Sequence, residues 1–177
     1  IGAPSFSDGE PERGRAWVVY GRADGGTVEL SEVAEGEGGF AVDGLSAFDW
    51  AGASVAMGGD LNGDGLSDVL VGAPFATVVE ADYSGHAYVV YGGGDGTIDV
   101  LYQVADGRAR HFGHALAGVG DINGDGRDDI AIGAPEAKAS KLYREGEVYV
   151  IFSDQGLDGT FDAGLIVDEG RGLRITG

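Results

Sequence analysis

The chain lacks cysteine altogether and has only 4 prolines, 3 histidines and 1 methionine among its 177 residues. No stretch approaches the roughly 18 apolar residues of a membrane-spanning helix, so we expect no transmembrane segment. Basic residues number only 11 against 30 acidic ones, which gives a formal net charge of −19. A surface of this charge repels the phosphates of nucleic acid, and we therefore expect no nucleic-acid partner.

Glycine, in contrast, is abundant, with 35 residues. Glycine weakens helices through its backbone entropy, and no segment has a convincing helical period. Short runs of β-branched and aromatic residues, separated by Gly/Asp turns, predict strands instead. The clearest four are residues 87–92, 97–104, 114–120 and 129–134. The sequence therefore predicts an all-β fold.

Two stretches are near-copies of each other, GDLNGDGLSDVLVGAP (59–74) and GDINGDGRDDIAIGAP (120–135). In each loop, positions 1, 3, 5 and 9 are Asp, Asn, Asp and Asp, and position 7 can offer its backbone carbonyl. Gly65 and Gly126 allow the tight turn. The candidate metal ligands are Asp60, Asn62, Asp64, Leu66 and Asp68 in the first loop, and Asp121, Asn123, Asp125, Arg127 and Asp129 in the second.

This set of oxygen ligands suits Ca²⁺, which takes six to eight oxygens, better than Mg²⁺, which keeps several waters. Neither loop contains His or Cys, which argues against zinc or copper. An EF-hand would need a bidentate Glu at position 12, where this chain has Val71 and Ile132. We therefore predict two Ca²⁺ sites, each in a β-hairpin. The alternative is a solvated acidic turn without metal, which the presence of two matching copies disfavours.

The repeat extends beyond the loops, because GRAWVVYG (14–21), GHAYVVYG (85–92) and GEVYVIFS (146–153) are versions of one strand. We divide the chain, as one domain of residues 1–177, into repeat units at approximately 1–70, 71–131 and 132–177, the last one incomplete. The extra length of the first unit falls at residues 32–40. Self-similarity on this scale, with about four strands a unit, predicts β-propeller blades of four antiparallel strands.

Phe112-Gly113 upstream of the second loop and Gly-Ala-Pro downstream of both loops resemble the FG-GAP repeat of integrin α-subunit propellers and their bacterial relatives. The resemblance implies Ca²⁺ in the hairpin loops and an extracellular or cell-surface protein that acts in adhesion or ligand binding. We expect a bacterial source, with which the absence of cysteine is compatible. The first unit has Ala51-Gly52 in place of Phe-Gly, and we expect Trp50 to fill the aromatic position.

The chain begins with the end of one unit and ends before a further loop, so we expect it to be part of a larger propeller. Its partners would then be other propeller blades or protein subunits, joined through residues 1–4 and 165–177. Two aromatic series recur at equivalent strand positions, and we interpret them as blade packing: Trp17, Tyr88 and Tyr149, and Tyr20, Tyr91 and Phe152.

Evidence for enzyme chemistry is thin. We interpret His111 and His114 as strand or turn residues, and Asp128 as a solvated neighbour of the ligand Asp129. Two classes of function remain. The first is a non-enzymatic, calcium-stabilised module for adhesion, surface assembly or binding of a protein or carbohydrate ligand. The second is an accessory propeller of a larger secreted enzyme, such as a polysaccharide-degrading one. The appended domains of the full-length protein would distinguish them.

Overall fold

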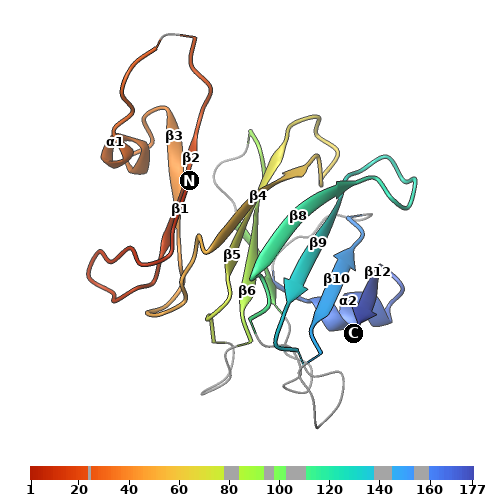
Figure 1. Ribbon diagram of the computed structural model, residues 1–177. Coiled ribbons are helices and arrows are strands. Elements are labelled where there is room, and N and C mark those ends of the chain that lie inside the picture. Colours follow the sequence, from red (N-terminus) through yellow and green to blue (C-terminus); the bar gives the residue numbers. More distant parts are fainter. Residues whose placement is uncertain (24, 78–83, 94–97, 103–110, 138–144, 154–159) are drawn as a thin grey trace.

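The computed structural model describes residues 1–23, 25–77, 84–93, 98–102, 111–137, 145–153 and 160–177. In this part of the chain the strands form three sheets (Figure 1). Each sheet consists of strands that are close in the sequence, apart from one short strand near the C-terminus. The loops with the candidate metal ligands lie in the second and third sheets.

The first sheet has three antiparallel strands in the order β1-β2-β3. Its strands are β1 (Gly2–Ala3), β2 (Arg15–Val19) and β3 (Gly39–Asp43). Trp17 on β2 is buried, and its ring packs edge-on against Phe6 with the ring centroids 5.4 Å apart. The short helix α1 (Leu30–Ala34) contacts β2 and β3 and buries Val33. Part of the extra length of the first repeat unit therefore folds back onto this sheet.

The second sheet has five strands in the order β11-β7-β6-β5-β4. These are β4 (Ser54–Gly59), β5 (Asp68–Ala73), β6 (His86–Val90), β7 (Ile98–Tyr102) and β11 (Thr160–Asp162). The first four pair antiparallel, whereas β11 pairs with β7 in parallel. Since β11 follows the third sheet's β10 in the sequence, the chain returns to the outer edge of the second sheet before it completes the third.

The third sheet has four antiparallel strands in the order β12-β10-β9-β8. These are β8 (Ala115–Gly120), β9 (Asp129–Ala134), β10 (Glu147–Ile151) and β12 (Gly172–Thr176). Helix α2 (Ala163–Asp168) connects β11 to β12 and buries Ala163 and Ile166 in the core. Strands β4 and β8, the first of their sheets, lie side by side (Figure 1).

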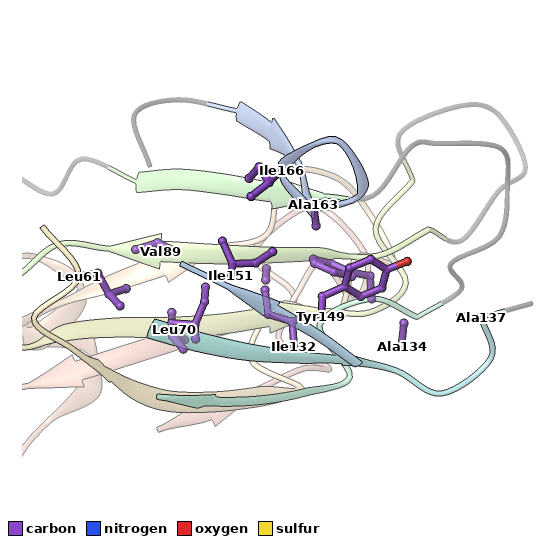
Figure 2. Packing of buried hydrophobic residues seen from close by; sticks show 13 residues of the cluster. Leu61, Leu70, Val89, Ile132, Ala134, Ala137, Tyr149, Ile151, Ala163 and Ile166 are labelled. Carbon is purple, nitrogen blue, oxygen red and sulfur yellow. The ribbon is translucent and has the colours of Figure 1, made fainter. Parts of the chain in front are cut away.

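The alternation of side chains along β5 explains why the second sheet is buried on both faces. Val71 belongs to a cluster with Ala16 and Val42 of the first sheet. Leu70, the adjacent residue, belongs to a second cluster with Ile130 and Ile132 of the third sheet. Figure 2 shows this second cluster, with Tyr149 and Ile151 of β10 in its centre and Ile166 of α2 at its edge. Each pair of neighbouring sheets thus shares one apolar core.

The prediction of an all-β, blade-like fold is confirmed. The sheets differ from four uniform strands, since the described residues give three, five and four. Two short helices also occur among the described residues, each of little more than one turn, and they bury the apolar side chains of Val33 and Ile166 against a sheet. The predicted strand at 97–104 appears as β7, although residues 97, 103 and 104 lie outside the described part of the chain.

The aromatic series at the first strand position is confirmed as packing, because Trp17, Tyr88 and Tyr149 are all buried. The second series is only partly so, since Tyr20 is 56% exposed. The prediction for Trp50 is wrong. Ala51 is fully buried where Phe112 is buried in the next repeat, and Trp50 lies half-buried against Phe75 with ring centroids 4.7 Å apart.

Removal of a core side chain should show that the sheet interface carries stability. Ile132 is fully buried between the second and third sheets, so Ile132→Ala should lower the free energy of unfolding by about 2–5 kcal/mol. Ile175 on β12 is 57% exposed, and Ile175→Ala should change it by only about 0.5 kcal/mol. Urea denaturation of both variants tests the difference, and equal losses would contradict the packing described above.

Burial of His86 should make stability depend on pH. Burial lowers the pKa of His86 to about 4, from an ordinary value of 6.5. The unfolded chain therefore binds this proton at a higher pH than the folded chain, and stability should fall as the pH drops from about 6.5 to about 4. NMR titration of the imidazole should give a midpoint near 4, and His86→Leu should lose this part of the acid sensitivity. A midpoint near 6.5 would contradict the burial of the ring.

Candidate metal sites in two matching loops

The two candidate loops occupy equivalent places in neighbouring sheets. The first connects β4 to β5 and the second connects β8 to β9, each as the turn of an antiparallel hairpin. Both hairpins also have the same irregularity just before the loop, where the register shifts between Met57 and Gly59 and between Gly118 and Gly120. The loops therefore join strands, as the sequence predicts, and are not EF-hands.

In the first loop, the carboxylate of Asp60 at position 1 organises the turn. Its Oδ1 accepts hydrogen bonds from the backbone N–H groups of Gly63 (2.7 Å) and Asp64 (3.0 Å). Its Oδ2 accepts one from Gly65 at 2.8 Å. Gly65 has a φ of 84°, a conformation that strains other residues. One side chain thus satisfies three consecutive backbone donors and holds the loop closed.

The second loop repeats this arrangement atom for atom. Asp121 Oδ1 accepts from Gly124 (2.7 Å) and Asp125 (3.1 Å), and Oδ2 accepts from Gly126 at 2.9 Å. Gly126 has a φ of 94°. Two loops 61 residues apart in the sequence (121 − 60) therefore fold identically, because the same residue types stand at the same positions.

Positions 3 and 5 lie close together in both loops. The amide Nδ2 of Asn62 donates to Asp64 Oδ2 at 3.0 Å, and Asn123 donates to Asp125 Oδ2 at 2.9 Å. The amide oxygen Oδ1 of each Asn accepts a hydrogen bond from the backbone N–H of the same Asp, at 3.0 Å in both loops. Asp64 and Asp125 are exposed, so their carboxylates can be reached from solvent.

The Asp at position 9 ties each loop to the next strands. Asp68 and Asp129 are fully buried. Asp68 Oδ2 accepts from Leu61 at 2.7 Å, and its Oδ1 accepts from Gly92, just after β6, at 2.8 Å. Asp129 accepts in the same way from Ile122 (3.0 Å) and from Ser153, just after β10 (3.2 Å).

Burial raises the pKa of Asp68, the N–H donors of Gly92 and Leu61 oppose this shift, and the charges of Asp64 and Asp60 add to it. The net direction is upward. The Asp68 carboxylate is therefore buried close to other negative charges, and a bound cation would reduce the repulsion among them.

Position 7 contributes little through its side chain. Leu66 is 48% exposed, and Arg127 is half-buried with its Nη1 donating to the carbonyl of Ser153 at 3.2 Å. Only the backbone carbonyl of either residue is suited to a cation. The predicted ligands of each loop are thus contiguous around one turn. Among the described residues, however, no three His, Cys, Asp or Glu side chains gather closely enough to be recognised as a metal cluster.

The position-1 and position-9 carboxylates of both loops accept hydrogen bonds from backbone N–H groups. Two of the five predicted ligands in each loop are an amide and a backbone carbonyl. The donor set itself consists only of oxygen, with three carboxylates a loop. By its chemistry it fits a hard cation such as Ca²⁺.

The interpretation of Asp128 as a solvated neighbour is wrong. Asp128 is half-buried, and its Oδ2 accepts the backbone N–H of Asp60 at 2.9 Å. Its own N–H donates to the carbonyl of Asp60 at 3.0 Å. A residue of the second loop is therefore bound to position 1 of the first loop. Sequence reasoning missed this contact because Ser67 stands at the equivalent position of the first loop, so the repeat pattern gives no signal there.

The residues that flank the loops also join neighbouring sheets. The hydroxyl of Ser54, at the start of β4, donates to the carbonyl of Gly113 at 2.7 Å. Phe112 is fully buried and packs edge-on against Tyr149, with ring centroids 5.5 Å apart. The Phe-Gly pair therefore serves as a packing element at the junction of the second and third sheets.

In the part of the chain that the structure describes, no helix has the length and apolar character needed to cross a bilayer.

Comparison with known proteins agrees with this architecture. The FG-GAP repeat model matches residues 51–90 and 112–151. Integrin alpha-4 of Xenopus laevis is 37% identical over 123 residues, which are 67% of this chain and 11% of that protein. Integrin alpha pat-2 of Caenorhabditis briggsae is 44% identical over 89 residues, 47% of this chain and 7% of that protein. Integrin alpha-2 of Mus musculus is 34% identical over 143 residues, 76% of this chain and 11% of that protein.

The chain thus spans about a tenth of the length of these relatives, from 7% to 11%. All three come from animals, and they give the expectation of a bacterial source no support. The two matched segments begin at Ala51 and Phe112, 61 residues apart (112 − 51), which is the spacing of the two loops. The chain is an FG-GAP repeat protein, built of sheets of the β-propeller blade type and similar in sequence to integrin alpha chains.

Proposed function

We propose that each of the two loops binds one Ca²⁺ and that the ions stabilise a non-enzymatic propeller module of an extracellular or cell-surface protein. The module acts in adhesion, ligand binding or surface assembly. The observation that carries the proposal is the identical folding of the two loops, in which one Asp orders the turn and oxygen atoms stand at alternating positions. The similarity to integrin alpha chains supports the cellular setting.

The ligands in this proposal are the side chains at positions 1, 3, 5 and 9 and the backbone carbonyl at position 7. They are Asp60, Asn62, Asp64, Leu66 and Asp68 in the first loop, and Asp121, Asn123, Asp125, Arg127 and Asp129 in the second. Ca²⁺ tolerates variable geometry and accepts six to eight oxygens, so water can complete the shell of five protein ligands. Mg²⁺ demands near-octahedral geometry and gives up its water reluctantly, so it should bind less well.

The role of the ion is structural. Each loop holds three carboxylates on a chain that is already strongly acidic, and repulsion among them opposes the closed turn. A cation that binds only the folded loop removes this repulsion and stabilises the fold by mass action. Because the Asp at position 9 of each loop accepts a hydrogen bond from the second residue after β6 or β10, this stabilisation extends to the sheet.

The partner in this proposal is a further propeller blade or a protein subunit that covers the outer face of the third sheet. Leu61 of the first loop is fully buried against the third sheet. Its counterpart in the second loop, Ile122, is 50% exposed, and on the same sheet Val148 and Ile175 are 38% and 57% exposed. Val148 and Ile175 pair directly across β10 and β12 and so lie on one face. A neighbour that packs there would cover the outer face of the third sheet, as the third sheet covers one face of the second.

Calcium should raise the melting temperature of the protein. Saturating Ca²⁺ is expected to stabilise the fold by about 3–4 kcal/mol for each of the two sites at a hundred- to a thousandfold excess over Kd, and EDTA should reverse the effect. Differential scanning fluorimetry in Ca²⁺, Mg²⁺ and EDTA measures this, with the Mg²⁺ sample as the control for ionic strength. An unchanged melting temperature in all three, with elemental analysis that finds no bound metal, would contradict the proposal.

Each site should be removable without the other. Asp64→Ala and Asp125→Ala each delete the exposed position-5 carboxylate of one loop, so isothermal titration calorimetry should report one Ca²⁺ per chain in place of two. Glu169→Gln, which removes an exposed charge far from both loops in the sequence, should leave two. Loss of both sites through either substitution would show that the loops share one metal.

A further inference from the structure

We propose that Asp128 is a positioning residue that couples cation binding in the second loop to cation binding in the first. The inference rests on the proposed function, since it concerns the affinity of the loops for Ca²⁺. It goes beyond that function because it assigns a role to a residue outside both ligand sets. It also predicts that the two sites do not act independently.

The coupling has a direct structural path. Asp128 makes two hydrogen bonds to the backbone of Asp60. Its side chain accepts one from the Asp60 N–H, and its own N–H donates the other to the Asp60 carbonyl. The Asp60 carboxylate in turn holds the backbone N–H groups of Gly63, Asp64 and Gly65. Asp128 thus holds Asp60 in place, and Asp60 in turn organises the first loop.

At its other end, Asp128 belongs to the second loop. It lies at position 8, between Arg127 and Asp129, which are the predicted ligands at positions 7 and 9. Its carbonyl accepts from the hydroxyl of Ser153, whose N–H donates to Asp129 at 3.2 Å. A cation that draws positions 7 and 9 together must therefore also fix the backbone of Asp128.

The first loop is shaped to receive this side chain. A Cβ atom added to Gly59 would lie 2.1 Å from Asp128 Oδ2, a distance that no real contact allows. Gly120, the equivalent residue of the second loop, has a similar φ, 73° against 83°, but no atom within 4 Å of an added Cβ. Glycine at 59 is thus needed for the approach of Asp128 as well as for its conformation. The first loop has Ser67, which is exposed, where the second has Asp128.

The two states that Ca²⁺ biases are an ordered and a loosened second loop. With Ca²⁺ bound, Asp121, Asp125 and Asp129 are neutralised, Asp128 is held in place, and the first loop is organised for its own ion. Without Ca²⁺, repulsion among the three carboxylates loosens the second loop and the anchor with it. Coupling is reciprocal, so binding to the first loop must favour binding to the second by the same factor.

A double-mutant cycle tests the coupling. Calorimetry measures the affinity of the first loop for Ca²⁺ in the unmodified protein and in Asp125→Ala, which disables the second loop. The same pair of measurements is then made in the presence of Asp128→Ala. With Asp128 present, Asp125→Ala should weaken Ca²⁺ binding to the first loop about fivefold, at the low end of the usual range of coupling. With Asp128→Ala, the same substitution should leave that affinity unchanged. Ser67→Ala, at the matched position, should leave the coupling intact.

Asp128→Asn serves as a conservative variant if Asp128→Ala does not fold, because its amide oxygen can still accept from Asp60. It should retain most of the coupling. Gly59→Ala gives an independent measurement: both glycines have a positive φ, but only at Gly59 does an added Cβ clash with Asp128, so Gly59→Ala should weaken Ca²⁺ binding to the first loop more than Gly120→Ala weakens binding to the second. If Asp125→Ala changes the affinity of the first loop equally with and without Asp128, or changes it in neither case, the proposed coupling is wrong. In that event, the finding of two Ca²⁺ bound to the unmodified protein would still support the proposed function. Absence of Ca²⁺ binding in the unmodified protein would overturn both.

Discussion

The structure depends on one packing constraint, namely that the second sheet is apolar on both faces. Side chains alternate along a strand, so Leu70 and Val71, adjacent in β5, must be buried on opposite sides. Neither face can be left to water without a cost of about 1.5–3 kcal/mol for each large side chain. The sheet is therefore stable only between two others, and the first and third sheets supply the cover. Stacking of this kind is what distinguishes blades from isolated hairpins.

The same constraint brings the two acidic loops together. Because β4 and β8 are the equivalent strands of stacked sheets, their hairpin turns lie on the same side, and Asp128 reaches Asp60. A high density of negative charge at this point is unfavourable by itself. It is compensated in part by seven backbone N–H groups, which make eight hydrogen bonds. One of these bonds goes to Asp128, and the others go to the side-chain oxygens of the first loop. A bound cation would complete the compensation, which gives the ion a structural role.

The features that the sequence predicted are those set by local pattern. The hairpin loops follow from Asp, Asn and Gly at fixed positions, and the blade-like sheets follow from alternating apolar residues repeated three times. The features it did not predict depend on contacts distant in sequence. Asp128 and Asp60 are 68 residues apart, and neither position is unusual within its own repeat. Trp50 was assigned to the aromatic position because it adjoins Ala51, yet Ala51 fills that buried site and Trp50 packs on Phe75. Helix α2 and the parallel strand β11 arise from a crossing to the neighbouring sheet, which no local period records.

A crystal structure of the protein grown with saturating Ca²⁺, with the ions located by anomalous scattering, tests the central claim most directly. The account predicts one ion in each loop, held at about 2.3–2.6 Å by oxygens from positions 1, 3, 5, 7 and 9. The Asp60 and Asp121 carboxylates should each contribute an oxygen, and Asp128 should remain bound to the Asp60 backbone. Loops that keep the present hydrogen bonds and show no ion at saturating Ca²⁺ would contradict the claim, as would ions bound only outside the loops.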